Sequence, residues 1–230
     1  MLNGPLNFLT INEVSPVMYY LLDSGSGNIL AYNKYWEYLR IVIVTDFRPI
    51  FSIRINDQIC VSGFNTINIY DKYLNLTVKS ISLGDYSGVY FNVNNSLIYI
   101  VKDYLIGIYD QSLSEVDSFT TTHSSWFITE HDWTMLITDS SSGNIYLYLN
   151  GVLINTIATI CINRVTSILF DANNYMLVLC QIPSYIYIYE TNGAYTGISI
   201  QVCTSSAYYM NFDSKNRLVI TCQDNVVIYY

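Results

Sequence analysis

Four aspartates stand at similar places in the chain, at the start of a recurring apolar segment or up to four residues before it. They are Asp23, Asp103, Asp139 and Asp224. If their carboxylates met at one opening, they would offer the several oxygen ligands that a hard cation such as Ca²⁺ takes. Aspartate is also a common turn residue, because its carboxylate accepts hydrogen bonds from nearby backbone N–H groups. Gly63 and Gln181 fill the same place elsewhere, so turn formation is the favoured explanation and a calcium site is the alternative.

Other chemistry finds little support in the residue types. A histidine-based metal site needs several imidazoles, and the chain has only His123 and His131, which we expect on opposite faces. No Gly-x-Ser-x-Gly sequence marks a serine nucleophile. No glycine-rich loop leads into a helix, so phosphate binding is not indicated. The sequence therefore contains no recognisable catalytic constellation.

The elements that would position these residues come from one repeated segment. It occurs at Gly27–Tyr32, Asn65–Tyr70, Tyr104–Tyr109, Gly143–Tyr148, Ser184–Tyr189 and Asp224–Tyr229. The first branched residue of each copy follows the previous one by 38, 39, 39, 41 and 40 residues. A period of about 40 residues is typical of a four-stranded propeller blade. We therefore predict an all-β, six-bladed β-propeller of antiparallel blades that forms a single domain over residues 1–230.

Turn residues divide each copy into short strands, lettered A to D from the inside outwards. The predicted repeats span residues 6–44, 47–83, 86–122, 124–160, 163–202 and 205–230. The last repeat stops after strand C. Propellers usually close by lending a strand from one terminus to the blade at the other. We therefore expect a three-stranded last blade in a truncated or weakly closed ring, and a fragment of a longer protein is an alternative.

Composition narrows the range of partners. The 230 residues are 51% hydrophobic and include 23 tyrosines, which suits a large β core. The net charge is −8 and the basic residues are scattered, so nucleic acid and anionic membranes are not expected partners. No apolar run is long enough to span a membrane. We expect a monomer. The N-terminus does not resemble a signal peptide, so an extracellular location is favoured only if a signal peptide is missing from this chain.

Four of the five cysteines form two pairs with the same spacing. Cys161 precedes Cys180 by 19 residues and Cys203 precedes Cys222 by 19, while Cys60 is left over. One interpretation is a disulfide within each of the last two repeats. The favoured interpretation is repeat homology, with a small apolar residue duplicated along with its blade and kept reduced.

Asp23–Tyr32 and Asp139–Tyr148 resemble the NHL repeat, in which an aspartate, a small polar turn and an asparagine precede a branched residue and a closing aromatic. The usual arginine of that motif is replaced here, for example by Asn28 and Asn144, so the resemblance is to a divergent member. The Trp-Asp signature of WD repeats is absent. The resemblance implies a six-bladed ring whose members mostly bind other molecules, with a minority of hydrolases and an amidating lyase.

The loops from strand B to C and from D to A should gather on one face around the central channel. The residues predicted to bind a ligand there are Arg48, Tyr86, Asp103, His123, Trp126 and Arg164. Trp126 is suited to stacking on a sugar or anchoring a peptide, although a packing role is favoured. We predict a non-enzymatic binding or scaffold propeller for a protein or glycan, without a cofactor. The alternatives are a Ca²⁺-dependent, gluconolactonase-like hydrolase and a piece of a larger NHL-repeat protein.

Overall fold

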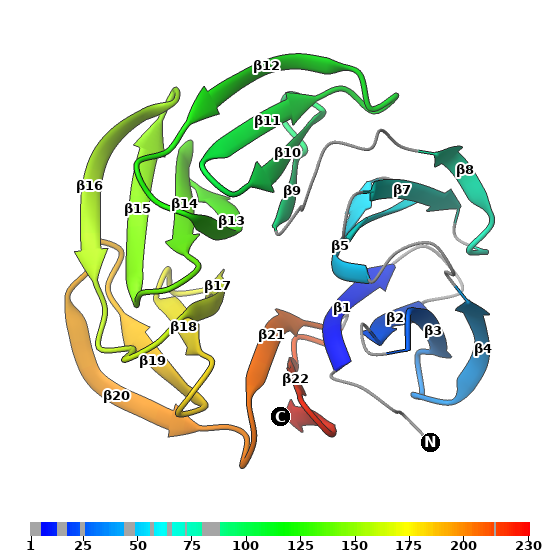
Figure 1. Ribbon diagram of the computed structural model, residues 1–230. Coiled ribbons are helices and arrows are strands. Elements are labelled where there is room, and N and C mark those ends of the chain that lie inside the picture. Colours follow the sequence, from blue (N-terminus) through cyan, green and yellow to red (C-terminus); the bar gives the residue numbers. More distant parts are fainter. Residues whose placement is uncertain are drawn as a thin grey trace.

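Six antiparallel sheets surround a common centre in the computed structural model (Figure 1). The structure describes residues 6–12, 18–23, 26–43, 49–55, 58–63, 66–71, 73–79, 88–213 and 215–230. All the regular elements in these ranges are strands, and none of the described segments is a helix that could cross a membrane. The predicted all-β, six-bladed propeller is therefore confirmed.

Each blade consists of consecutive strands that pair in chain order. Blade 1 contains β1 (Leu6–Asn12), β2 (Met18–Asp23), β3 (Asn28–Asn33) and β4 (Tyr38–Ile43), and blade 2 contains β5 (Pro49–Ile55), β6 (Gln58–Gly63), β7 (Thr66–Asp71) and β8 (Leu76–Lys79). Blade 3 contains β9 (Val89–Asn92), β10 (Leu97–Lys102), β11 (Leu105–Tyr109) and β12 (Glu115–Thr120), and blade 4 contains β13 (Ser125–His131), β14 (Thr134–Asp139), β15 (Asn144–Leu149) and β16 (Val152–Ala158). Blade 5 contains β17 (Val165–Phe170), β18 (Met176–Cys180), β19 (Tyr185–Tyr189) and β20 (Tyr195–Gln201), and blade 6 contains β21 (Ala207–Phe212), β22 (Leu218–Cys222) and β23 (Val226–Tyr229).

The tyrosine that ends the repeated segment marks a bulge between the third and fourth strands. The pairing shifts register at Tyr32, Tyr70, Tyr109, Tyr148 and Tyr189. A bulge bends its strand and re-aims the side chain. Four of these five rings are buried, and the Tyr189 hydroxyl accepts a hydrogen bond from the Ile160 N–H of the preceding blade at 2.9 Å. The recurring tyrosine therefore fills the space between neighbouring blades.

Aspartate and asparagine close the turns by accepting backbone hydrogen bonds. The Asp110 carboxylate accepts from the N–H groups of Ser112 and Ser114, both at 2.9 Å. Leu113 in this turn has a positive φ of 63° and is buried. The same arrangement recurs at Asn33, Asp71, Asp171 and Asp213. These five side chains stabilise turns, as aspartate and asparagine commonly do.

Apolar side chains between adjacent sheets form the core, and the inner strands contact each other around the ring. Blade 6 has three strands, as predicted, and its strands β21 and β22 pack against β1 of blade 1. Val226 and Ile228 of β23 join Tyr19, Leu21 and Leu30 of blade 1 in one apolar cluster. In the described part of the chain, the ring therefore closes through side-chain packing between blades 6 and 1.

The cysteine pairs differ from the favoured prediction. Cys161 is bonded to Cys180 and Cys203 is bonded to Cys222, while the buried Cys60 is free. Each disulfide joins the loop before an inner strand to the end of the strand beside it, where the Cα atoms lie 5.6 and 6.1 Å apart. Duplication of a blade explains why the two cysteine pairs have the same spacing. The expectation of reduced thiols was wrong, because each pair of cysteines faces each other at a distance that allows a disulfide.

Candidate functional site

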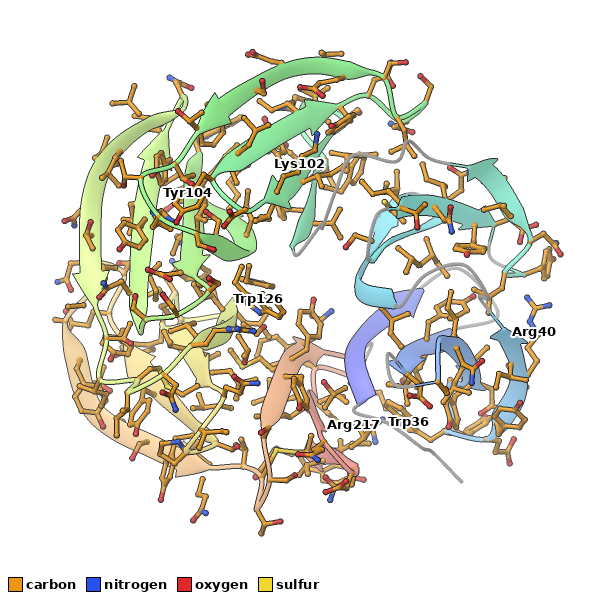
Figure 2. The ribbon with its side chains drawn as sticks, viewed as in Figure 1. Trp36, Arg40, Lys102, Tyr104, Trp126 and Arg217 are labelled. Carbon is orange, nitrogen blue, oxygen red and sulfur yellow. A yellow bond between two sulfur atoms is a disulfide. The ribbon has the colours of Figure 1, made fainter. Side chains whose placement is uncertain are left out.

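Trp126 lies near the centre of the ring (Figure 2), where the guanidinium of Arg164, from the D–A loop before β17, contacts its indole. A bulge between Ser125 and Ile128 interrupts the pairing of β13 with β14 and leaves Trp126 outside the regular register. The Arg164 guanidinium lies 3.9 Å from the centre of the Trp126 ring, and its Nε donates to the Ser140 carbonyl at 2.7 Å. Both side chains are half-buried. The structure thus brings together two of the six residues predicted to bind a ligand.

The Arg164 charge is held in an acidic and partly desolvated setting. Burial lowers the pKa of its guanidinium, while the Asp139 carboxylate acts in the opposite direction. The arginine guanidinium stays protonated in proteins. The only side-chain hydrogen bond seen from Arg164 to the described residues comes from Nε, so its Nη groups are available to a partner. The pair offers a fixed cation and an aromatic edge at one place.

His123 lies in the D–A loop before β13 but does not reach a ligand-binding position. Its side chain is only 7% exposed, and its ring stacks on Tyr146 with 3.5 Å between the ring centres. Neither ring nitrogen has a hydrogen-bond partner among the described residues. Burial lowers the pKa of His123, and the Asp139 carboxylate partly offsets this effect. A neutral, packed imidazole is the state that this environment favours.

Stability should therefore fall as the pH drops from above the ordinary histidine pKa of about 6.5 towards the lowered pKa of folded His123. The reason is that the unfolded chain takes up the proton at a higher pH than the folded chain does. We expect His123→Phe, which retains an aromatic ring against Tyr146, to make thermal stability less dependent on pH between pH 7.5 and 5. The comparison variant is His131→Phe, on the opposite face. An unchanged pH dependence in His123→Phe would contradict the assignment.

The four acids considered for calcium do not share a role. The Asp139 carboxylate accepts from the N–H and Oγ of Ser141 at 2.7 and 2.9 Å, and Asp23 binds Ser26 in the same way at 3.1 and 2.6 Å. Burial would raise the pKa of Asp139, but the hydrogen bonds of its turn and nearby His123 lower it overall. Asp103 and Asp224 are exposed. Among the described residues, no three His, Cys, Asp or Glu side chains come together at a spacing that could hold a metal ion.

The other residues predicted to bind a ligand are Asp103, Arg48 and Tyr86. The Asp103 carbonyl accepts from the Ser125 N–H at 2.9 Å, which ties blade 3 to blade 4, while the Asp103 side chain remains exposed. Arg48 and Tyr86 lie outside the described residues. The two histidines stand near opposite ends of β13, as the strand order implied, and His131 stacks on Phe170 at 3.8 Å.

Three exposed isoleucines on this face are absent from the sequence-based set. Ile160 and Ile162 lie in the loop before β17, and Ile182 lies in the turn after β18. Their side chains are 46, 79 and 52% exposed. Asn163 donates to the Ile182 carbonyl at 3.1 Å, so the two loops are adjacent. We refer to Ile160, Ile162 and Ile182 as the isoleucine rim. The sequence gives one indication of the isoleucine rim, which is that these branched apolar residues lie between predicted strands and not within them.

Comparison with known proteins supports the fold. No family model matches this sequence, and no curated protein does so. Solved structures do match: the WD40 β-propeller domain of Doa1 has a TM-score of 0.75 and 13% identity, over 97% of this chain and 77% of that chain. A chain of the mitotic checkpoint complex has a TM-score of 0.69 and 14% identity, over 93% of this chain and 69% of that chain.

These likenesses define the class of protein, a β-propeller with structural neighbours among WD40 domains. At this identity they show the fold alone. The resemblance to NHL repeats is not confirmed, although the sequence lacks the Trp-Asp signature of the WD class. Both classes of propeller share the period and the strand pattern, so these structural likenesses do not distinguish NHL repeats from WD repeats.

Proposed function

We propose that this chain is a binding propeller that engages a protein partner through the isoleucine rim and the adjacent Trp126–Arg164 pair. The observation that carries the proposal is the exposure of three large apolar side chains on two adjacent loops, beside a half-buried Trp–Arg contact. Contiguous exposed apolar side chains with a polar surround are typical of protein interaction sites.

The Trp126–Arg164 pair suits the centre of such an interface. Tryptophan and arginine are the residue types most enriched among interface positions with large binding energies. Here the cation–π contact and the bond to the Ser140 carbonyl hold the guanidinium in place before binding. A preorganised side chain loses less conformational entropy when a partner binds. Its Nη groups would then donate to carbonyl or carboxylate oxygens of the partner.

A protein partner is favoured over a glycan at this site. A sugar ring that stacks on Trp126 would have to compete with Arg164, which already covers one face of the indole. The isoleucine rim offers apolar contact area and no hydroxyl-binding groups. One structural neighbour is a chain of a multiprotein complex, which is consistent with propellers acting as scaffolds. With a net charge of −8, a partner with neutral or basic character is expected.

The experiment compares two exposed isoleucines that differ only in location. Ile162 is in the rim, and Ile198 is 54% exposed on the outer strand β20. Using immobilised chain and extract from the source cells, we expect a partner that the native protein and Ile198→Glu both bind, with affinity for Ile162→Glu reduced at least about tenfold. Equal binding by the two variants would exclude the rim as the interface. Circular dichroism melts check that both variants fold.

A further inference from the structure

A cleft between blades 3 and 4 lies on the opposite face from the isoleucine rim. It has a volume of about 490 Å³. It is lined by β9–β12 of blade 3, and by the β13–β14 hairpin and the turn after β15 in blade 4. This volume is in the range of small-ligand sites. The polar and aromatic side chains among its lining residues include Asn92, Tyr99, Asp117, Phe119, Glu130 and Trp133. No prediction from the sequence concerned this cleft.

Trp133 stands at its edge in a strained and exposed conformation. His131 pairs with Thr134, so Asp132 and Trp133 form a two-residue hairpin turn with φ values of 47° and 66°. Such turns favour Asn-Gly, as at Asn150–Gly151, because a bulky side chain at positive φ costs about 1 kcal/mol or more. The Trp133 side chain is nevertheless 68% exposed, so little packing offsets that cost. A strained, exposed indole beside a cleft is a candidate ligand contact.

The cleft is acidic and contains no cation. Asp117 and Glu130 are among its lining residues, which include no Lys, Arg or His. Asn92 Nδ2 donates to Glu130 Oε2 at 2.5 Å, and the side-chain oxygen Oδ1 of Asn92 accepts from the N–H groups of Asn94 and Asn95. No ion pair among the described residues includes either acid. The amide therefore orients the Glu130 carboxylate without neutralising it.

The surroundings of Glu130 contain no positive charge among the lining residues of the cleft. Burial raises the pKa of Glu130, and the hydrogen bond from Asn92 offsets only part of the rise. Burial, with Glu130 and Tyr99 nearby, also raises the pKa of Tyr90 to about 12. A cation beside Glu130 would favour its ionised carboxylate, whereas an anionic ligand such as a phosphate would oppose it.

We propose that this cleft binds an arginine side chain presented by a peptide or protein. The guanidinium group is planar, so it can stack on the exposed indole of Trp133 while its N–H groups donate to the oriented carboxylate of Glu130. Lysine offers a point charge without the planar surface and fits this combination less well. The site is independent of the isoleucine rim, so a failure of either proposal leaves the other standing.

The test is a titration of the native protein with N-acetylarginine amide, followed by NMR. Its matched control is N-acetylcitrulline amide, which has nearly the same shape but carries no charge, because a carbonyl oxygen replaces one nitrogen of the guanidinium group. We expect saturable binding of the arginine probe and at least tenfold weaker binding of the citrulline probe. Equal binding of the two, or no saturation by arginine up to its solubility limit, would overturn the proposal; the first outcome would indicate a neutral polar ligand such as a sugar.

Two variants locate the binding. Glu130→Gln should weaken arginine binding at least tenfold, whereas Asp132→Asn should not, because Asp132 is exposed nearby but does not line the cleft. Trp133→Gly should also lose binding at least tenfold and yet melt at the same temperature or higher, because glycine relieves the positive φ. Undiminished binding in Glu130→Gln and Trp133→Gly would contradict the assignment.

Discussion

Replacement of Cys161 and Cys180 by serine is expected to lower the free energy of unfolding by about 3 kcal/mol under oxidising conditions. The disulfide spans 19 residues and ties the loop that contains Ile160 and Ile162 to the end of β18. Without it, the unfolded chain gains the conformational freedom that the covalent loop removes. Urea denaturation of the native and double-serine proteins measures the difference.

The control for this prediction is reductant. Reductant should lower the free energy of unfolding of the native protein by about the same amount for each disulfide that it breaks. It should leave the stability of a variant with all four paired cysteines replaced unchanged. Cys60 stays outside the comparison, because burial raises the pKa of its thiol to about 12 and the cysteine is unreactive in the folded state. Alkylation of denatured, unreduced protein should modify one cysteine; modification of all five would contradict the pairing.

Gly143→Ala is expected to destabilise the protein by about 2–3 kcal/mol. A Cβ at this position would overlap the backbone carbonyl of Cys161 and lie 3.1 Å from the Cys161 Cβ. The Gly143 carbonyl also accepts from Thr159 Oγ1 at 2.5 Å, so the two loops are fixed against each other by backbone contact. Neither backbone can move without disturbing the disulfide loop. Urea denaturation again gives the change.

Gly197→Ala is the matched control for Gly143→Ala. Gly197 has a φ of 86°, and a Cβ there would meet no atom within 4 Å. Its substitution should therefore cost only the backbone strain of a left-handed alanine, about 1 kcal/mol. A Gly143→Ala variant that is no less stable than Gly197→Ala would show that the loops are not in close contact.

The sequence predicted the fold well because the repeat is local. Each copy places Asn or Asp at a turn, branched residues in a strand and tyrosine at its end, and these preferences act over a few residues. The three-stranded blade 6 follows from the same period, whereas the bulge at five of the repeated tyrosines was not predicted. The disulfides were weighed incorrectly, because equal spacing alone does not report whether two strands bring the sulfurs to bonding distance.

The site was predicted only in part, since its geometry depends on contacts between blades. Trp126 and Arg164 were chosen separately, and their stacking needed the bulge in β13 and the loop before β17 in the same place. His123, which was also predicted to bind a ligand, is packed against Tyr146. The isoleucine rim and the cleft beside Trp133 could not be recognised, because the sequence does not show whether an apolar residue in a turn is exposed to solvent or buried.

Hydrogen–deuterium exchange of the chain with and without its captured partner tests the central claim most directly. The claim is that a protein partner covers the isoleucine rim and the Trp126–Arg164 pair. We expect slower exchange on binding in residues 159–164 and 181–184, with no change in the outer strand β20. Protection confined to β20 or to the opposite face, with residues 159–164 and 181–184 unchanged, would contradict it.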